Sequence, residues 1–340
     1  MTTHFEPSKL RRMQLSENSQ TDKPTDSGPK GYAHIFFMDG VGLGNDDPAV
    51  NPFVRAHLPH LTGLLGEGWY LERDVRSRER ATLVPTDASM GVSGRPQSAT
   101  GQATILTGRN VPRLLGRHYG PKPNSAISEV VRAGSLFQEV VDAGGTAALI
   151  TPYPHQYFEA IDSGRRLLSA VPLAATSAGL SLMTADDLQQ GHAVSPSFTG
   201  EAWRTHLGYE NIPQLTLEAA GRRIAAIARR YNFSFFEHWP SDRLGHRGTL
   251  EEAVRHLERI DAALGGLFDA WDDSGLLIIT SDHGNIENKG YRQHTQNPVP
   301  TILMGPGHAT LANLIDNLTD SARVVRRHLA LDRQDTAAES

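Results

Sequence analysis

Short apolar runs alternate along the chain with longer stretches in which apolar residues recur every three or four positions. The runs are bounded by glycine, proline and acidic residues, and they span 33–38, 146–150, 233–239, 276–280 and 299–304. Runs of this length with turn signals at their ends are typical of buried strands in a parallel sheet. Helical patterns lie over 135–143, 217–230, 250–271 and 309–331. This alternation predicts an α/β fold, with a mostly parallel central sheet and helices on both faces.

Three segments lack this alternation of strand and helix patterns, and they indicate how the chain is divided into domains. Residues 1–30 are polar and predict a disordered leader. Residues 332–340 predict a flexible tail. Residues 152–215 lack the alternation and predict a small inserted cap over the site. The stretches 31–151 and 216–331 then form the core.

Composition narrows the class of protein. The net charge of −5 over 340 residues offers no basic surface for nucleic acid. No apolar run approaches the ~20 residues that span a bilayer, and the first residues lack the pattern of a signal peptide. Cysteine is absent, which excludes disulfides and thiolate chemistry. These features predict a cytoplasmic protein that binds neither nucleic acid nor membrane.

Acidic residues stand where three of the apolar runs end. Asp39 follows the first run, Asp242 follows the third and Asp282 follows the fourth. The C-terminal ends of strands are the edge at which open α/β sheets bind ligands. A single aspartate at such a place is more often a helix cap or a turn residue.

Histidines accompany these aspartates at spacings that favour metal binding. His283 is adjacent to Asp282, His246 lies four residues after Asp242, and His294 precedes the last apolar run. Carboxylate oxygens together with imidazole nitrogens suit zinc, manganese and similar divalent ions. The pattern therefore predicts a metal site at the strand ends.

A candidate nucleophile lies in the segment PQSATGQATILTGR. Pro96 interrupts the chain, and the following residues can begin a helix with Ser98 near its N-terminus, where unpaired N–H groups favour an anion. A serine hydroxyl needs a base or a metal to become an effective nucleophile. Thr100 competes for this role, and an isolated serine here is more often a helix cap. The residues alone leave the choice open.

Five motifs now carry a family resemblance. They occur in the order DGVG at Asp39, SATGQATILTGR at Ser98, DRLGHRG at Asp242, SDHGNIE at Asp282 and HTQNPVP at His294. Together they resemble the metal-binding core of cofactor-independent phosphoglycerate mutase, within the alkaline phosphatase superfamily. The resemblance covers roughly residues 33–115 and 215–308. It implies an alkaline-phosphatase-like core, formed by 31–151 and 216–331, that binds metal and carries out catalysis.

The resemblance also implies roles for single residues. One divalent metal ion, Mn²⁺ or Zn²⁺, would be held by Asp39, Ser98, Asp282 and His283. A second would be held by Asp242, His246 and His294. Ser98 rather than Thr100 takes the nucleophile position and would form a phosphoserine. Arg109 is expected to pack or pair with an acidic residue rather than bind phosphate.

Departures from the mutase pattern affect the expected activity. The mutases have histidine where this chain has Gln102, Glu-Val where it has Ala99-Thr100, and a much larger cap. The first expectation is therefore a phosphatase that hydrolyses a small phosphomonoester through Ser98. A phosphomutase, a phosphodiesterase or phosphonate hydrolase, and a catalytically silent metal-binding protein are the alternatives. Basic residues in and near the cap are expected on the solvated surface: Lys122, Arg165, Arg166 and Arg204.

Overall fold

A computed structural model describes residues 28–71, 73–272 and 274–331. The expected tail, and all but the last three residues of the expected leader, lie outside these ranges. Among the described residues, every helix is too short or too polar to cross a bilayer.

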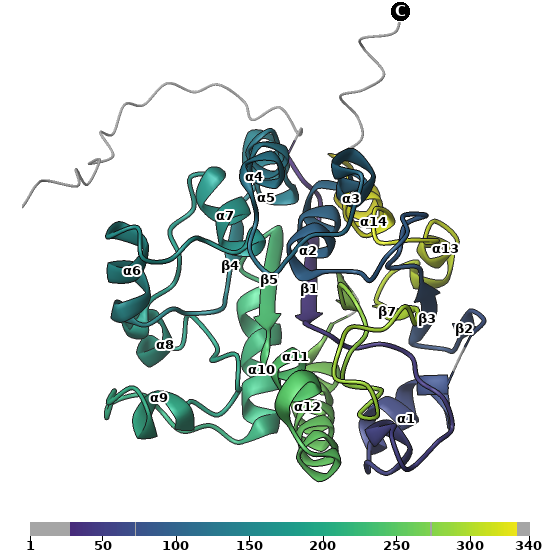
Figure 1. The fold of residues 1–340 in the computed structure, drawn as a ribbon. Helices are drawn as coiled ribbons and strands as arrows, with labels where there is room; N and C mark the ends of the chain where they lie inside the picture. Colours follow the sequence, from purple (N-terminus) through teal and green to yellow (C-terminus); the bar gives the residue numbers. More distant parts are fainter. Residues whose placement is uncertain (1–27, 72, 273, 332–340) are drawn as a thin grey trace, which may run out of the picture.

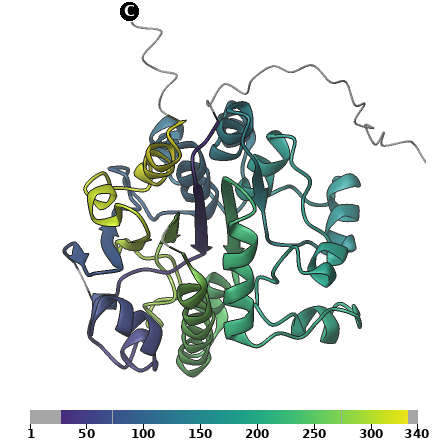
Figure 2. The same cartoon turned by 180° about the vertical axis from the view of Figure 1, so that it is seen from behind.

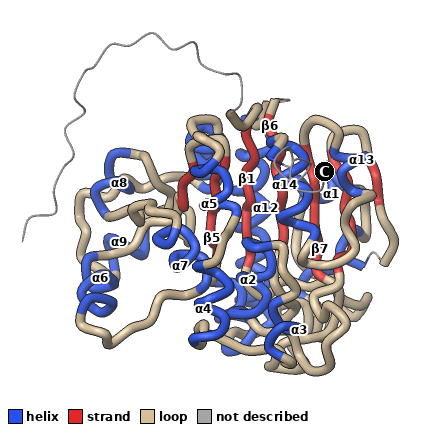
Figure 3. Tube along the Cα trace, turned by 90° about the horizontal axis from the view of Figure 1, so that it is seen from above, coloured by secondary structure: helices blue, strands red, loops and turns tan. Residues whose placement is uncertain are grey.

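A seven-stranded sheet forms the centre of the molecule, in the order β2-β3-β7-β6-β1-β5-β4 (Figures 1 and 3). Its strands are β1 Tyr32–Met38, β2 Arg76–Ser77, β3 Ala81–Thr86, β4 Ala147–Leu149, β5 Phe233–His238, β6 Gly275–Thr280 and β7 Val299–Met304. All five apolar runs form strands, and every residue of β1, β5, β6 and β7 is buried. Side chains buried on both sides of the sheet explain why these strands read as continuous apolar runs.

The sheet is mixed. Strands β4, β5, β1 and β6 are parallel, whereas the pairs β6–β7, β7–β3 and β3–β2 are antiparallel. Strand β7 follows β6 through a loop without an intervening helix, so the chain returns in the opposite direction. The sequence pattern did not predict β2 and β3. Pro85 lies inside β3 and pairs with Pro300, an arrangement that a strand near the sheet edge tolerates.

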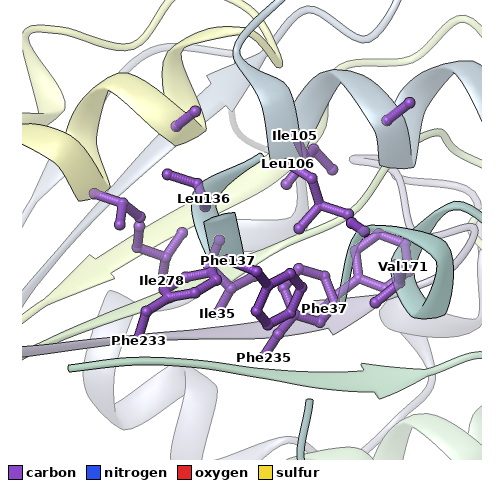
Figure 4. Close-up of a cluster of buried hydrophobic side chains, with 14 of the residues drawn as sticks. Ile35, Phe37, Ile105, Leu106, Leu136, Phe137, Val171, Phe233, Phe235 and Ile278 are labelled. Carbon is purple, nitrogen blue, oxygen red and sulfur yellow. The ribbon is translucent and has the colours of Figure 1, made fainter. Parts of the chain in front are cut away.

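Two layers of helices cover the sheet (Figures 1 and 2). One layer contains α2 Ser98–Thr107, α4 Ser125–Arg132, α5 Leu136–Asp142, α7 Ala170–Ser177 and α14 Asp320–Leu329. Figure 4 shows part of its core, where Phe37 of β1 lies near Phe235 of β5 and Phe137 of α5. The opposite layer contains α1 Pro59–Leu65, α10 Leu217–Ala228 and α12 Leu250–Ala270. The expectation of an α/β fold with helices on both faces is confirmed.

Helices α10 and α12 pack unusually closely because glycines lie at their contact. A methyl group on Gly221 of α10 would overlap the carbonyl oxygen of Ala263, and one on Gly266 of α12 would overlap the carbonyl oxygen of Glu218. The two backbones therefore touch directly. This contact holds α12 beside the strand ends that carry the candidate site.

The connection between β4 and β5 contains the segment expected to form a cap. Its helices α6 His155–Asp162, α8 Ala185–Gln190 and α9 Glu201–Thr205 lie together at the β4 side of the molecule (Figure 1). A small apolar cluster of its own includes Leu188, Trp203 and Ile212. Helix α7 differs, because its Val171 and Leu173 belong to the main core. The cap assignment stays a prediction.

The helix expected over 309–331 is wrong as a single element. The structure has α13 His308–Ala312 and α14, separated by a turn at 313–319. A carboxylate oxygen of Asp320 accepts hydrogen bonds from the backbone N–H groups of Asp316 and Asn317, which stabilises the turn. The remaining short helices are α3 Val111–Leu115, α11 Pro240–Arg247, and the 3-10 helices η1 Pro52–Val54 and η2 Trp69–Leu71.

Candidate metal centre

The three strand-end aspartates converge because their strands are neighbours in the sheet. Strand β1 lies between β5 and β6, and all three are parallel, so their C-terminal ends meet at one edge (Figure 1). Asp39 follows β1 directly, Asp242 lies in the first turn of α11 just after β5, and Asp282 follows β6. The structure thus brings the three carboxylates to one edge of the sheet, as their positions after the apolar runs predicted.

Asp39, Asp282 and His283 form a first group of potential metal ligands, whose ligand atoms all lie within 4.8 Å of one another. The Nε2 atom of His283 is 3.4 Å from Oδ1 of Asp39 and 3.6 Å from Oδ2 of Asp282. The Ser98 hydroxyl joins this group, with Oγ 3.0 Å from the same Nε2 atom. All four residues are buried.

Asp242, His246 and His294 lie beside the first group. The Oδ1 atom of Asp242 is 3.4 Å from Nε2 of His246 and 3.5 Å from Nε2 of His294, and the two imidazole nitrogens are 3.1 Å apart. His283 connects the groups, because its ligand atom also lies within 4.8 Å of those of Asp242 and His294. Its ring stacks on that of His294 with centroids 3.6 Å apart. The structure therefore brings all seven sequence-predicted residues together.

The electrostatics of the cluster fit a cation. Burial raises the pKa of Asp39 well above its ordinary value, and the charges of Asp282 and Asp242 raise it further. Burial and Asp242 likewise raise the pKa of Asp282 to about 7, and burial lowers the pKa of His283 to about 3. Buried carboxylates this close together are costly unless a positive charge compensates them. The buried Oδ1 atom of Asp39 also lacks a hydrogen-bond partner among the described residues.

Contacts behind the ligands orient them toward the centre. The Nδ1 atom of His294 is 2.8 Å from the carbonyl oxygen of Pro96, which leaves Nε2 facing Asp242. The Nδ1 atom of His246 is 3.2 Å from the carbonyl oxygen of Arg292. The amide of Asn285 donates to Oδ1 of Asp242 at 2.7 Å. Such contacts set the ring orientation and tautomer of metal-binding histidines. The donor set and its orientation fit divalent metal ions.

Helix α2 brings Ser98 to this cluster by a close approach at Gly101. A Cβ atom at that position would lie 2.8 Å from Cβ and 2.9 Å from the carbonyl oxygen of Asp282. Only glycine lets the helix lie directly against the loop after β6. Thr100 points elsewhere: its hydroxyl lies 3.0 Å from the carbonyl oxygen of Gln97 and accepts the backbone N–H of Tyr119.

Comparisons with known proteins find similarity in the part of the chain that holds most of this geometry. A model described as the metalloenzyme superfamily matches residues 210–332, which include Asp242, His246, Asp282, His283 and His294. The 2,3-bisphosphoglycerate-independent phosphoglycerate mutase of Thiobacillus denitrificans is 33% identical over 114 residues. The match covers 31% of this chain and 22% of the mutase, so the chain spans only about a fifth of that relative's length.

Solved structures share the fold of this chain. A mutant alkaline phosphatase of the Antarctic bacterium TAB5 aligns with a TM-score of 0.51 at 13% identity, over 90% of this chain and 99% of that chain. The phosphoglycerate mutase of Leishmania mexicana aligns with a TM-score of 0.52 at 12% identity, over 90% and 96%. The alkaline-phosphatase-like fold expected from the motifs is confirmed.

Sequence reasoning missed two residues that support the metal centre. The amide nitrogen of Gln102, one turn after Ser98, is 3.3 Å from Oδ2 of Asp39 and 3.4 Å from Oδ2 of Asp282. Glu287 accepts the backbone N–H groups of Gly42 and Asn285 on one oxygen, and the side chains of Thr295 and Asn297 on the other. Glu287 thereby ties together three of the loops that carry candidate ligands. Its place in the motif SDHGNIE was the one available signal.

Arg109 lies away from the candidate metal centre. It follows the C-terminus of α2, whereas Ser98 begins that helix. Ten helical residues span about 15 Å. This separation favours a packing role over contact with a phosphoryl group.

Proposed function

We propose that the protein is a metal-dependent phosphatase that hydrolyses a small phosphomonoester through a phosphoserine at Ser98. The observation that carries the proposal is the position of the Ser98 hydroxyl, 3.0 Å from Nε2 of His283 and beside both ligand groups. Ser98 also lines a cavity of about 290 Å³ together with Asp39 and Asp242, one carboxylate from each proposed metal site. A phosphoryl group in this cavity would face both sites.

The proposed metal sites follow from the donor geometry and the family resemblance. Asp39, Ser98, Asp282 and His283 would hold one divalent ion, Mn²⁺ or Zn²⁺, and Asp242, His246 and His294 would hold the other. When bound, such ions supply positive charge that activates a hydroxyl group and stabilises charge on phosphoryl oxygens. The remaining contribution comes from the chain itself, through positioning and helix polarity.

The chain's own residues would act in two steps. Ser98 Oγ loses its proton to water in the cavity and attacks phosphorus, so an O–P bond to Ser98 forms while the ester O–P bond breaks. The leaving oxygen takes a proton from water. In the second step water attacks phosphorus, the bond from phosphorus to Ser98 Oγ breaks, and Ser98 Oγ regains a proton as inorganic phosphate leaves. The N-terminus of α2 supports both steps, because the positive end of the helix dipole favours negative charge beside Ser98.

A phosphomutase is the second candidate. The relative from Thiobacillus denitrificans is named as a mutase, and the segment that matches it supports related chemistry. In a mutase the phosphoserine would return its phosphoryl group to another hydroxyl of the same substrate. That outcome requires the dephosphorylated intermediate to stay bound. The short segment over 152–215 favours hydrolysis, because it offers less chain to enclose such an intermediate.

Incubation of the metal-loaded protein with a panel of phosphomonoesters, phosphodiesters and phosphonates tests the proposal. We expect inorganic phosphate from phosphomonoesters and no positional isomer. Acid trapping followed by peptide mapping should place the phosphoryl group on Ser98. An isomer without phosphate release would establish the mutase. Bound metal without turnover of any member of the panel would refute the proposed function and leave a silent metal-binding protein.

A further inference from the structure

The cavity that contains Ser98 extends to side chains outside the metal centre. Lys122, from the loop before α4, and Arg166, from the loop after α6, line it together with Tyr153 and Tyr157. Both cations were expected on the solvated surface, and Arg166 is exposed, whereas Lys122 is partly buried. Both nevertheless line the cavity beside the proposed nucleophile, and this position calls for a further interpretation.

Neither cation forms a salt bridge with a carboxylate of the described residues. Among the described residues, no carboxylate oxygen lies within 4 Å of the side-chain nitrogens of Lys122 or Arg166. Burial lowers the pKa of Lys122, and the nearby charge of Arg166 lowers it further. The Arg166 guanidinium lies over the ring of Tyr157, 4.8 Å from its centroid, and this contact fixes it at the cavity. Two neighbouring cations without such a salt bridge favour an anionic ligand.

Glu237 is the one carboxyl group lining this cavity that the metal centre does not use, among the residues that the structure describes. It is buried at the end of β5, and its Oε2 accepts a hydrogen bond of 2.8 Å from the Tyr153 hydroxyl. Burial raises the pKa of Glu237, although the Tyr153 hydroxyl and the charges of Lys122 and Arg166 oppose the rise. Even a charged Glu237 balances only one of the three cations that line the cavity, Lys122, Arg166 and Arg243. The cavity outside the metal centre therefore keeps an excess of positive charge.

We infer that Lys122 and Arg166 form a cationic subsite for a second anionic group on the organic part of the substrate. The substrate class is then a small phosphomonoester that also carries a carboxylate or a second phosphate. This inference rests on the proposed function. Its physical basis is that a phosphoryl group at Ser98 fills the metal side of the cavity and leaves the two cations for the rest of the molecule.

A second cleft competes for the organic group. It measures about 950 Å³ and is lined by His294, Arg95, Arg117 and Tyr291, but not by Ser98. The Arg95 guanidinium is already engaged, because it stacks on the Tyr291 ring and donates to its hydroxyl group. The cavity with Lys122 contains the nucleophile and a carboxylate from each proposed metal site. It is therefore the one in which substrate binding and chemistry coincide.

Matched substrates provide the test. Ethyl phosphate and phosphoglycolate differ by one carboxylate, and propane-1,3-diol monophosphate and bisphosphate differ by one phosphate. We expect kcat/KM to be at least tenfold higher for the doubly anionic member of one pair, and the pair that responds identifies the anion. Lys122→Ala and Arg166→Ala should lower that value by roughly 10- to 100-fold, as expected for a lost charge-assisted hydrogen bond. Their kcat/KM for the singly charged member should stay within about threefold of wild type.

Two arginine variants serve as controls for the loss of one positive charge. Arg165 is exposed like its neighbour Arg166, but it contacts the hydroxyl group of Ser163 and does not line the cavity, and Arg117 lines the competing cleft. Arg165→Ala and Arg117→Ala should both keep the substrate preference. Loss of the preference in Arg117→Ala instead would place the organic group in the other cleft and overturn the inference. Equal losses on ethyl phosphate and phosphoglycolate in Lys122→Ala would also overturn it, because the lysine would then act on the transferred phosphoryl group.

Binding measurements separate this inference from the proposed function. Calorimetry on the metal-loaded Ser98→Ala protein compares the affinities for phosphoglycolate and ethyl phosphate without any turnover. We expect phosphoglycolate to bind at least tenfold more tightly, and the combined Lys122→Ala and Arg166→Ala substitutions to remove the difference. Equal affinities in the Ser98→Ala protein would refute the subsite even if the enzyme is a phosphatase. A retained difference without wild-type turnover would refute the phosphatase and keep the subsite.

Discussion

At the scale of single residues, the start of α2 presents two hydroxyl groups in different directions. Ser98 faces Nε2 of His283, whereas Thr100 hydrogen-bonds to the backbone of Gln97 and Tyr119. Two steps along a helix rotate a side chain by ~200°, so the two groups cannot face the same ion. The structure thus separates two candidates that the sequence alone left open.

Ser98→Ala should remove nearly all phosphoryl transfer, and Thr100→Val only part of it. Ser98→Ala deletes the proposed nucleophile. Thr100→Val removes the hydrogen bond to the backbone N–H of Tyr119 and leaves the residues of both ligand groups unchanged. Initial rates with an aryl phosphate measure both effects, and metal analysis shows whether the sites stay occupied. We expect Ser98→Ala to keep its metal, because Asp39, Asp282 and His283 remain. Turnover near the wild-type rate in Ser98→Ala would point to direct attack by water.

At the scale of elements, the contact between α10 and α12 has no space for a side chain at its two glycines. Gly221→Ala should lower the free energy of unfolding by roughly 1–3 kcal/mol or more, because the new methyl group meets backbone atoms that cannot rotate away. Gly63→Ala is the matched control, since Gly63 lies in α1 with nothing within 4 Å of an added methyl group. There the same change should stabilise by roughly 0.5–1 kcal/mol.

Denaturant titration of the two variants and the wild type measures these differences. A Gly221→Ala protein as stable as the wild type would show that the helices can separate without cost. An unchanged m-value is required for the comparison, because it shows that the denatured state has not altered.

Elements that carry a strong local pattern could be predicted from the sequence, and the others could not. The run over 233–239 reads as a buried strand because β5 is covered on both faces. Strand β3 was not predicted because Pro85 interrupts its apolar pattern, and because it pairs with β7, which is distant in the sequence. The single helix expected over 309–331 failed because the turn depends on hydrogen bonds to Asp320, which the apolar spacing does not record.

Some residues of the candidate site could likewise be predicted from the sequence, and others could not. Asp39, Asp242 and Asp282 could be placed together because strand ends in one parallel block share an edge. Glu287 could not be assigned its role, because its partner Gly42 is 245 positions away and becomes a neighbour only in the folded chain. Lys122 and Arg166 lie in loops whose path the sequence pattern does not determine, so their shared cavity emerged from the structure alone.

At the scale of the whole molecule, the metal centre joins loops from distant parts of the chain. We expect close to two divalent ions per purified chain, and chelation should abolish activity and lower the melting temperature. Metal that binds only the folded state stabilises that state by mass action. Elemental analysis and thermal scans with and without chelator measure both effects. Absence of bound metal, together with no stabilisation by added Mn²⁺ or Zn²⁺, would refute the assignment of the centre.

Acid should destabilise the metal-free protein through buried neutral histidines, of which His34 lies within β1 and is not one of the candidate ligands. Burial lowers the pKa of His34 to about 3, and its Nδ1 contacts the Ser234 hydroxyl at 2.8 Å. The unfolded chain takes up this proton near pH 6.5, whereas the folded chain does not until about pH 3. The stability that His34 contributes is therefore complete above pH 6.5 and is lost as the pH falls, by about 1.4 kcal/mol per pH unit.

His34→Leu tests this linkage. Unfolding free energies measured with chelator between pH 7 and pH 4.5 should fall less steeply in the variant, by about one proton. His155→Leu is the control, because that side chain is 76% exposed at the start of α6 and its ring remains in contact with water after folding. Parallel curves for the wild type and His34→Leu would show that His34 binds its proton equally well in both states.

The central position of β1 has a consequence for how the protein is made. Ala33 of β1 pairs with Phe233 of β5, and Tyr32 of β1 pairs with Gly275 of β6, so β1 is synthesised well before both strands with which it pairs. At 5–20 residues per second the delay until both have been synthesised is about 10–50 s. During this delay β1 is an apolar segment of the nascent chain that lacks its full set of partner strands. We therefore expect chaperones that bind nascent chains to raise the yield of folded protein in cell-free synthesis.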